Sequence, residues 1–142
     1  MITSIDQALA MLDDSSLPSL EREMAGRYLR THPDNKAIVR LVKALQDDDA
    51  GVAWSAAEAL ARLGEPAVKE LCHALSDHVR VGDPRLLTGA YHVLYHIENE
   101  TLKEQVSPLL LALKGPVPDL KAMEEADRLL KRLDHDRRKA RR

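Results

Sequence analysis

The sequence predicts an all-α protein, an α-solenoid or superhelix of about four antiparallel helical hairpins. Composition is the first reason, since the 142 residues include 23 leucines and 18 alanines, both strong helix formers, but no Phe, one Trp and three Tyr. Hydrophobic residues make up 44% and charged residues 31%, which is typical of a folded, soluble chain with one core. Internal repetition is the second reason.

Two helical patterns alternate along the chain. The first is clearest at residues 37–47, AIVRLVKALQD, and 67–77, AVKELCHALSD, which match at an offset of 30 residues. The second is clearest at residues 56–64, AAEALARLG. Each pattern has four copies, the others lying near residues 8–12 and 109–115 for the first, and at residues 25–33, 90–98 and 126–134 for the second. One hairpin cannot bury its apolar face alone, so we expect stacked copies to share a continuous core.

Residues with known capping preferences mark the helix boundaries. Ser4 stands where the first helix is expected to begin, and Gly64 suits a helix C-terminus. Asp83 followed by Pro84 suits the start of another helix, and Gly115 with the prolines beside it separates the last two. The expected helices cover residues 4–13, 17–31, 35–46, 50–63, 65–76, 84–98, 101–114 and 117–133.

Residues 52–75, VAWSAAEALARLGEPAVKELCHAL, carry an Ala-Ala-x-Ala-Leu run, a glycine at the turn, and a second helix with Val, Leu and Ala-Leu. In these features the chain resembles HEAT repeats, specifically the short bacterial kind also found in phycobilisome lyase-like proteins. Ala53 stands where that family usually has arginine, and Arg22 occupies the matching place in the preceding repeat. The resemblance implies a right-handed superhelix whose second helices line a concave face, and a scaffold or binding role. A minority of the family handles bilin pigments or damaged DNA bases, and the residues for those activities are not evident here.

The concave face is the expected binding surface, because solenoids bind partners on their extended concave surfaces. Its candidate residues occupy the outward positions of the second helices and together could bind an acidic partner surface. They are Arg40, Lys43, Lys69, Glu70, His73 and Leu111. The alternative is an ordinary solvated helix face.

A second candidate surface lies on the helix expected at residues 84–98. Tyr91 and Tyr95 are four residues apart, as are His92 and His96, so each pair shares a helix face. Two such histidines can share a metal ion, but no third ligand is indicated, so we predict no metal site. An aromatic–histidine recognition patch is favoured, since Tyr is enriched in binding hot spots; the alternative is that the tyrosines fill the core between repeats. Trp54, the only tryptophan, is a further binding candidate, although we expect it to pack in the core beside the apolar stripe of its helix.

Charge is distributed unevenly along the chain. Residues 131–142 hold seven basic and two acidic residues, a net charge of +5, whereas the remainder carries −7. We therefore divide the chain into a solenoid domain, residues 1–134, and a basic C-terminal tail, residues 135–142. The tail could attract nucleic acid, although the acidic body disfavours nucleic acid as the main ligand. Its basic residues are Arg137, Arg138, Lys139, Arg141 and Arg142.

Catalytic motifs are not evident. The sequence has no Gly-rich phosphate loop, nucleophile elbow or metal-ligand cluster, so we predict neither enzymatic activity nor a cofactor. Cys72 aligns with Val42 of the preceding repeat and is predicted to be a small buried hydrophobe. The lone cysteine, the lack of a signal-peptide pattern at the start, and the lack of a long apolar run make a cytoplasmic location the default.

The sequence therefore predicts a scaffold or adaptor that binds a protein partner through its concave face, with the Tyr91/Tyr95 helix as a second contact. One alternative is an accessory protein that handles a small ligand or pigment, which would need a closed pocket beside His92, Tyr95 or Cys72. The other alternative is nucleic-acid binding through the tail. The chain is expected to be a monomer or a weak homodimer, because the last helix carries apolar residues such as Leu120 that could pair.

Overall fold

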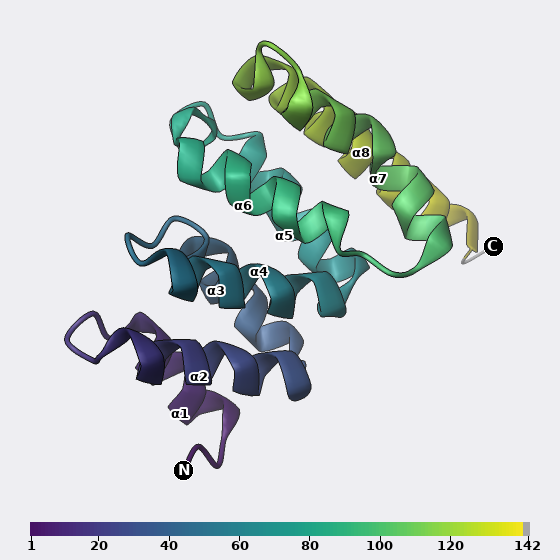
Figure 1. The fold of residues 1–142 in the computed structure, drawn as a ribbon. Helices are drawn as coiled ribbons and strands as arrows, with labels where there is room; N and C mark the ends of the chain where they lie inside the picture. The colour runs from purple at the N-terminus through teal and green to yellow at the C-terminus, as the bar shows by residue number, and fades with distance from the viewer. Residues whose placement is uncertain (141–142) are drawn as a thin grey trace.

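The computed structural model describes residues 1–140, with side chains described through residue 136. The prediction of an all-α solenoid is confirmed, because helical hairpins follow one another along a stack with no strand in the described residues (Figure 1). The helices are α1 (Ile5–Asp13), α2 (Ser19–Thr31), α3 (Ile38–Ala44), α4 (Ala50–Leu63), α5 (Glu65–Leu75), α6 (Pro84–Tyr95), α7 (Glu100–Lys114) and α8 (Pro118–Ala140), with short 3-10 helices at Asn35–Ala37 and Arg80–Gly82. Within residues 1–140, no helix combines the length and the apolar character that crossing a bilayer requires.

Local capping chemistry explains where these helices begin and end. The Ser4 hydroxyl accepts a hydrogen bond from a backbone N–H in the first turn of α1. The carboxylates of Asp49 and Asp83 do the same at the starts of α4 and α6. Gly64 ends α4 with a φ of 70°, a conformation that glycine adopts without the steric cost of a side chain. The predicted caps at Ser4, Gly64 and Asp83 are therefore confirmed.

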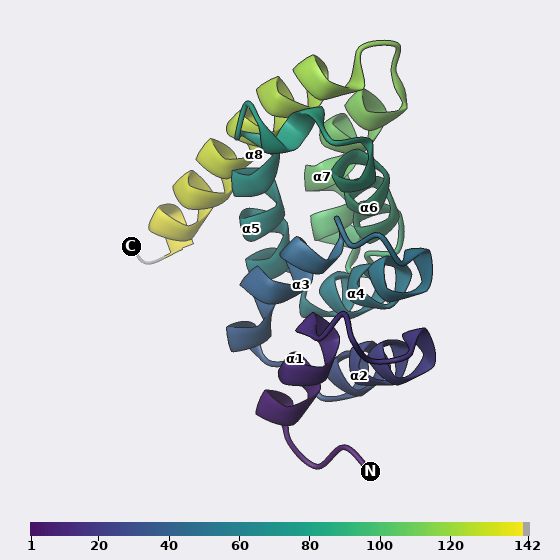
Figure 2. The same cartoon turned by 90° about the vertical axis from the view of Figure 1, so that its left-hand side faces the viewer.

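The helices form two layers (Figure 2). One layer contains α2, α4, α6 and α7 side by side, and the other contains α1, α3, α5 and α8. The stack bends toward the second layer, where the C-terminal part of α8 projects beyond α5. We call the α1/α3/α5/α8 side the inner layer and the α2/α4/α6/α7 side the outer layer.

The last hairpin departs from the predicted alternation. Because residues 109–115 repeat the pattern of α3 and α5, α7 is expected in the inner layer, but it packs beside α6 in the outer layer and α8 packs beside α5. Residues 96–99 join α6 to α7 within the outer layer, whereas Gly64 alone joins α4 to α5 across the two layers. In addition, α8 continues to Ala140, beyond its expected end near residue 133. Leucine spacing shows that a helix buries one face, but not which layer covers that face.

A single apolar cluster, rich in leucine and alanine, runs through the stack. Leu60 and Leu71 are fully buried in it, as expected for the stripes of α4 and α5. In the outer layer, α2 and α4 approach closely at Gly26, where an added Cβ would lie 2.5 Å from the Cβ of Ser55. The lack of a side chain at Gly26 therefore sets the spacing of these two helices.

Among the residues whose side chains are described, one charged side chain is buried within the stack. Arg22 of α2 is 6% exposed, and its guanidinium donates hydrogen bonds to the Leu12 carbonyl at 2.8 Å and to the Asp47 carboxylate at 2.5 Å. Asp47 lies in the turn between α3 and α4, so this ion pair ties the first hairpin to the second. Removing only one partner of such a pair leaves an uncompensated charge in the interior.

Candidate functional site

Trp54 of α4 lies at the centre of the candidate site. Its indole ring stacks on the imidazole of His92 from α6, with ring centroids 3.6 Å apart and planes inclined at 39°. The expectation that Trp54 packs in the core is wrong, because the residue is 54% exposed. Trp54 is two positions from both Val52 and Ala56, which are buried, and residues two apart on a helix face different directions. The stack therefore lies on the surface of the outer layer, across two neighbouring helices.

The histidine and tyrosine pairs of α6 extend this contact. The His96 ring lies 4.3 Å from that of His92 and 6.3 Å from that of Trp54, measured between centroids. Tyr95 is 59% exposed and lies 5.3 Å from His96, and the half-buried Tyr91 stacks on Tyr95 at 5.9 Å. We call these five residues the aromatic–histidine surface. The structure thus brings together all of the residues that the sequence singles out around this helix.

Glu58 and Arg30, which are not among the residues predicted from the sequence, form a chain of hydrogen bonds that orients the Trp54 ring. The Trp54 Nε1–H donates a hydrogen bond to Glu58 Oε1 at 2.5 Å, and Arg30 Nη1 of α2 donates to Glu58 Oε2 at 2.7 Å. Glu58 is four residues after Trp54 on the same helix, a spacing that could have indicated the pair. Arg30 comes from the preceding repeat, and no local pattern predicts its position.

The imidazole of His92 lies between the rings of Trp54 and His96. Its Nε2 atom is buried and has no hydrogen-bond partner among the described residues. Burial lowers the pKa of His92 and the neighbouring His96 lowers it further, while the Glu58 carboxylate opposes the shift. His92 is therefore neutral at pH 7 and packs against Trp54 as an uncharged ring.

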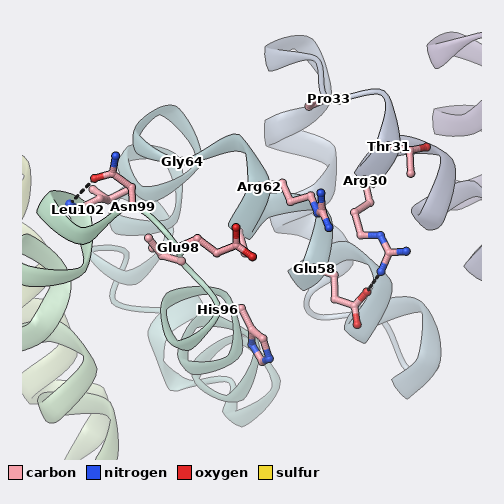
Figure 3. Close-up of a pocket in the computed structure, with 12 residues that line it drawn as sticks. Arg30, Thr31, Pro33, Glu58, Arg62, Gly64, His96, Glu98, Asn99 and Leu102 are labelled. Carbon is pink, nitrogen blue, oxygen red and sulfur yellow. Dashed lines mark hydrogen bonds and ion pairs between the residues drawn. The ribbon is translucent and has the colours of Figure 1, made fainter.

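A cleft of about 780 Å³ lies beside the aromatic–histidine surface (Figure 3). It is formed where α2, α4 and α6 end and where α5 and α7 begin. Its charged lining residues are Arg30, Glu58, Arg62 and Glu98, and His96 joins it to the aromatic rings. Arg30 and Arg62 enter the cleft from α2 and α4, whereas Glu98 enters from the connection between α6 and α7 (Figure 3).

Two basic candidates of the inner layer are engaged within the chain. Arg40 of α3 forms an ion pair with Asp13 of the first hairpin and donates to a backbone carbonyl of α1. Lys69 of α5 pairs with Asp134 of α8 at 3.1 Å and lines a second cleft of about 660 Å³ next to that helix. These contacts give both side chains a role in joining successive hairpins.

The other inner-layer candidates differ in their positions. Lys43 and His73 are exposed on α3 and α5, and Glu70 is half-buried. Leu111 is 65% exposed, but it lies on α7 and therefore in the outer layer, away from the other five candidates. The grouping of Leu111 with Lys43 and His73 is corrected by the reversed order of the last hairpin.

The basic tail begins as a continuation of α8. The helix extends through Arg137, Arg138 and Lys139 to Ala140. The side chains of these three basic residues, and all of Arg141 and Arg142, lie outside the described residues.

The small-ligand alternative requires a pocket beside His92, Tyr95 or Cys72, and neither cleft described above lies against these residues. Cys72 is fully buried, and burial raises the pKa of its thiol to about 12, so it is an inert core side chain as predicted. In the part of the chain that the structure describes, no group of three or more His, Cys, Asp or Glu residues could hold a metal ion.

Comparison with known families agrees with the two-layered stack of hairpins. A family model described as HEAT repeats matches residues 5–82, which is more than half of the chain. The chain therefore belongs to the HEAT-repeat family, as the resemblance of residues 52–75 predicts. No curated protein and no solved structure matches the chain. HEAT repeats generally act as protein-interaction scaffolds.

Proposed function

We propose that this chain is an interaction scaffold that binds a protein partner through the aromatic–histidine surface of its outer layer. The observation that carries the proposal is the exposed Trp54, which His92 holds against one neighbouring helix and Glu58 holds in orientation. A large apolar ring kept at the surface by specific contacts is not explained by core packing.

The energetics of protein interfaces support this assignment. Trp, Tyr and Arg are the residues most enriched in binding hot spots, and the surface offers Trp54 and Tyr95 with Arg30 and Arg62 in the adjoining cleft. Two contacts already orient the Trp54 ring, so binding a partner costs less side-chain entropy at this residue than it would if the ring were mobile. The surface therefore has both the composition and the preorganisation of an anchor point.

The inner layer supports a partner less well. Arg40 and Lys69 form ion pairs with residues of other hairpins. Of the basic and histidine side chains predicted for the concave face, only Lys43 and His73 are exposed without being engaged in such a pair among the described residues. Binding through the concave face stays a prediction, and it is tested in the same experiment as the outer surface.

The test compares three baits in an affinity capture from the cell that expresses the chain, after nuclease treatment, with proteins quantified by mass spectrometry. The baits are the wild type, Trp54→Ser/Tyr95→Ser on the outer layer, and Lys43→Glu/His73→Glu on the inner layer. We expect a protein that the wild type and the inner-layer variant retain and the outer-layer variant loses. The opposite pattern would move the binding site to the concave face. A protein captured only from a parallel lysate without nuclease would favour nucleic acid.

A further inference from the structure

The position of the His92 imidazole suits the neutral ring and not the protonated one. Its Nε2 atom is buried without a hydrogen-bond partner among the described residues, and the Trp54 indole stacks on the ring at 3.6 Å between centroids. A neutral imidazole carries one N–H group, whereas an imidazolium carries two N–H groups and a charge. Burying a charged donor without an acceptor costs more free energy than burying a neutral nitrogen. A protonated His92 is therefore poorly accommodated where the ring now lies.

His96 places a second titratable ring beside the first. Its Nδ1 lies 2.9 Å from the His92 carbonyl oxygen, which can only accept, so Nδ1 carries a proton and donates. Protonation of His96 keeps this hydrogen bond, because both nitrogens of an imidazolium are donors. The His96 ring is exposed and its centroid is 4.3 Å from that of His92. A charge on either ring therefore opposes a charge on the other.

Trp54 and a protonated His92 would compete for the Glu58 carboxylate. Glu58 accepts hydrogen bonds from the Trp54 Nε1–H at 2.5 Å and from Arg30 Nη1 at 2.7 Å (Figure 3). Its charge also acts on His92, since it opposes the lowering of the pKa of that ring. An imidazolium donates to a carboxylate more strongly than a neutral indole N–H, because the hydrogen bond is charge-assisted. A protonated His92 thus turns either to solvent or to Glu58, and both movements remove a contact that orients Trp54.

The elements packed against α6 supply few other charges to His92. Arg62 of α4 and Glu98 line the cleft together with His96, and His92 does not line that cleft. The helices α5 and α7 and the 3-10 helix Arg80–Gly82 also pack on α6. Their basic groups are engaged elsewhere: Lys69 with Asp134, Lys114 over the Tyr91 ring and Arg80 with Gln46. The balance at His92 is therefore set mainly by its burial, by His96 and by Glu58.

We propose that protonation of His92 releases the Trp54 indole from its stacked position, so that the aromatic–histidine surface presents its anchor ring at neutral pH and loses it in acid. The consequence for a partner rests on the proposed function: a protein that packs on the oriented Trp54 ring binds at neutral pH and dissociates as the pH falls. Because the pKa of His92 is lowered from 6.5, the transition takes place below that pH.

The release of Trp54 can be measured on the full chain without a partner. Trp54 is the only tryptophan, so its fluorescence reports on one ring. Acrylamide quenching is followed from about pH 8 to about pH 5, above the usual range of carboxylate titration, with circular dichroism to verify that the chain stays folded. As the pH falls, we expect quenching to increase reversibly. We also expect the nuclear Overhauser effect between the Trp54 and His92 rings to disappear.

Three substitutions separate this switch from general effects of acid. His92→Gln keeps a planar polar side chain that does not titrate, and it should abolish the transition. His96→Gln removes the neighbouring charge and should move the midpoint to higher pH. Glu58→Gln keeps an acceptor for Trp54 but removes the charge that favours the imidazolium, and it should move the midpoint to lower pH. His73→Gln, at an exposed histidine of the inner layer, is the matched control and should leave the transition unchanged.

Two results would overturn the proposal. One is quenching that stays constant or decreases in acid, as expected if a protonated His92 packed more firmly on Trp54 through a cation–π contact. The other is a transition that His92→Gln retains. The proposed function fails separately, because it depends on whether Trp54→Ser/Tyr95→Ser loses the captured protein at neutral pH. A surface that captures a protein in that experiment but shows no acid transition refutes only the switch.

Discussion

The buried ion pair between Arg22 and Asp47 gives a stability prediction whose size follows from the structure. The Arg22 side chain is 8% exposed and that of Asp47 is 20% exposed, so solvent can compensate little for a missing partner. In Asp47→Ala the guanidinium keeps its hydrogen bonds to the Leu12 carbonyl but loses its counter-charge, and the backbone N–H of Asp49 loses an acceptor. We expect a loss of about 3–5 kcal/mol in the free energy of unfolding.

Urea denaturation followed by circular dichroism at 222 nm measures this loss directly. The corresponding fall in Tm is roughly 10–20 °C for a domain of this size. The neighbouring Asp48 is the matched control, because its side chain is 97% exposed and its ion pair with Arg85 is at the surface, so Asp48→Ala should leave the denaturation midpoint close to that of the wild type. Equal and small effects of Asp47→Ala and Asp48→Ala would refute the interpretation of Arg22 as a buried charge that needs its partner.

Two further predictions concern the outer layer. Gly26→Ala should destabilise the chain by about 1–3 kcal/mol, since the added methyl group would overlap Ser55, whereas Gly82→Ala meets nothing within 4 Å and should be neutral or slightly stabilising in the same denaturation assay. Because the pKa of His92 is lowered in the folded chain, the unfolded chain binds more protons below pH 6.5, and stability should fall as the pH drops through that range. Replacing His92 by Gln should make this fall smaller, and an unchanged pH dependence would contradict the burial of the imidazole beside Trp54.

Much of the fold could be predicted because it depends on local chemistry. Helix periodicity gives the buried stripes, and the caps at Ser4 and Asp83 follow from the preference of these residue types for first turns. The arrangement of the last hairpin could not be predicted in this way. The leucine pattern of α7 is the same whether it packs on α5 or on α6, so the pattern does not decide in which layer the helix lies.

The residues of the candidate site could be predicted from the sequence, but their arrangement across two helices could not. The spacing of Tyr91, His92, Tyr95 and His96 indicates one continuous patch on a helix, and the structure shows that patch. The position of Trp54 depends on a neighbouring repeat, because a helix has to supply His92 for the indole ring to stack on. Contacts between repeats of this kind have no signature in the residues nearby in sequence.

The central claim is that a protein partner binds the aromatic–histidine surface, and site-specific photocrosslinking in the expressing cell tests it most directly. A photoreactive phenylalanine analogue is placed at Tyr95 on the outer layer or at His73 on the inner layer, both of which are exposed. We predict a discrete crosslinked protein from position 95 that disappears when Trp54→Ser is added, and no such product from position 73. A product from position 73 alone, or one from position 95 that Trp54→Ser does not affect, would contradict the claim.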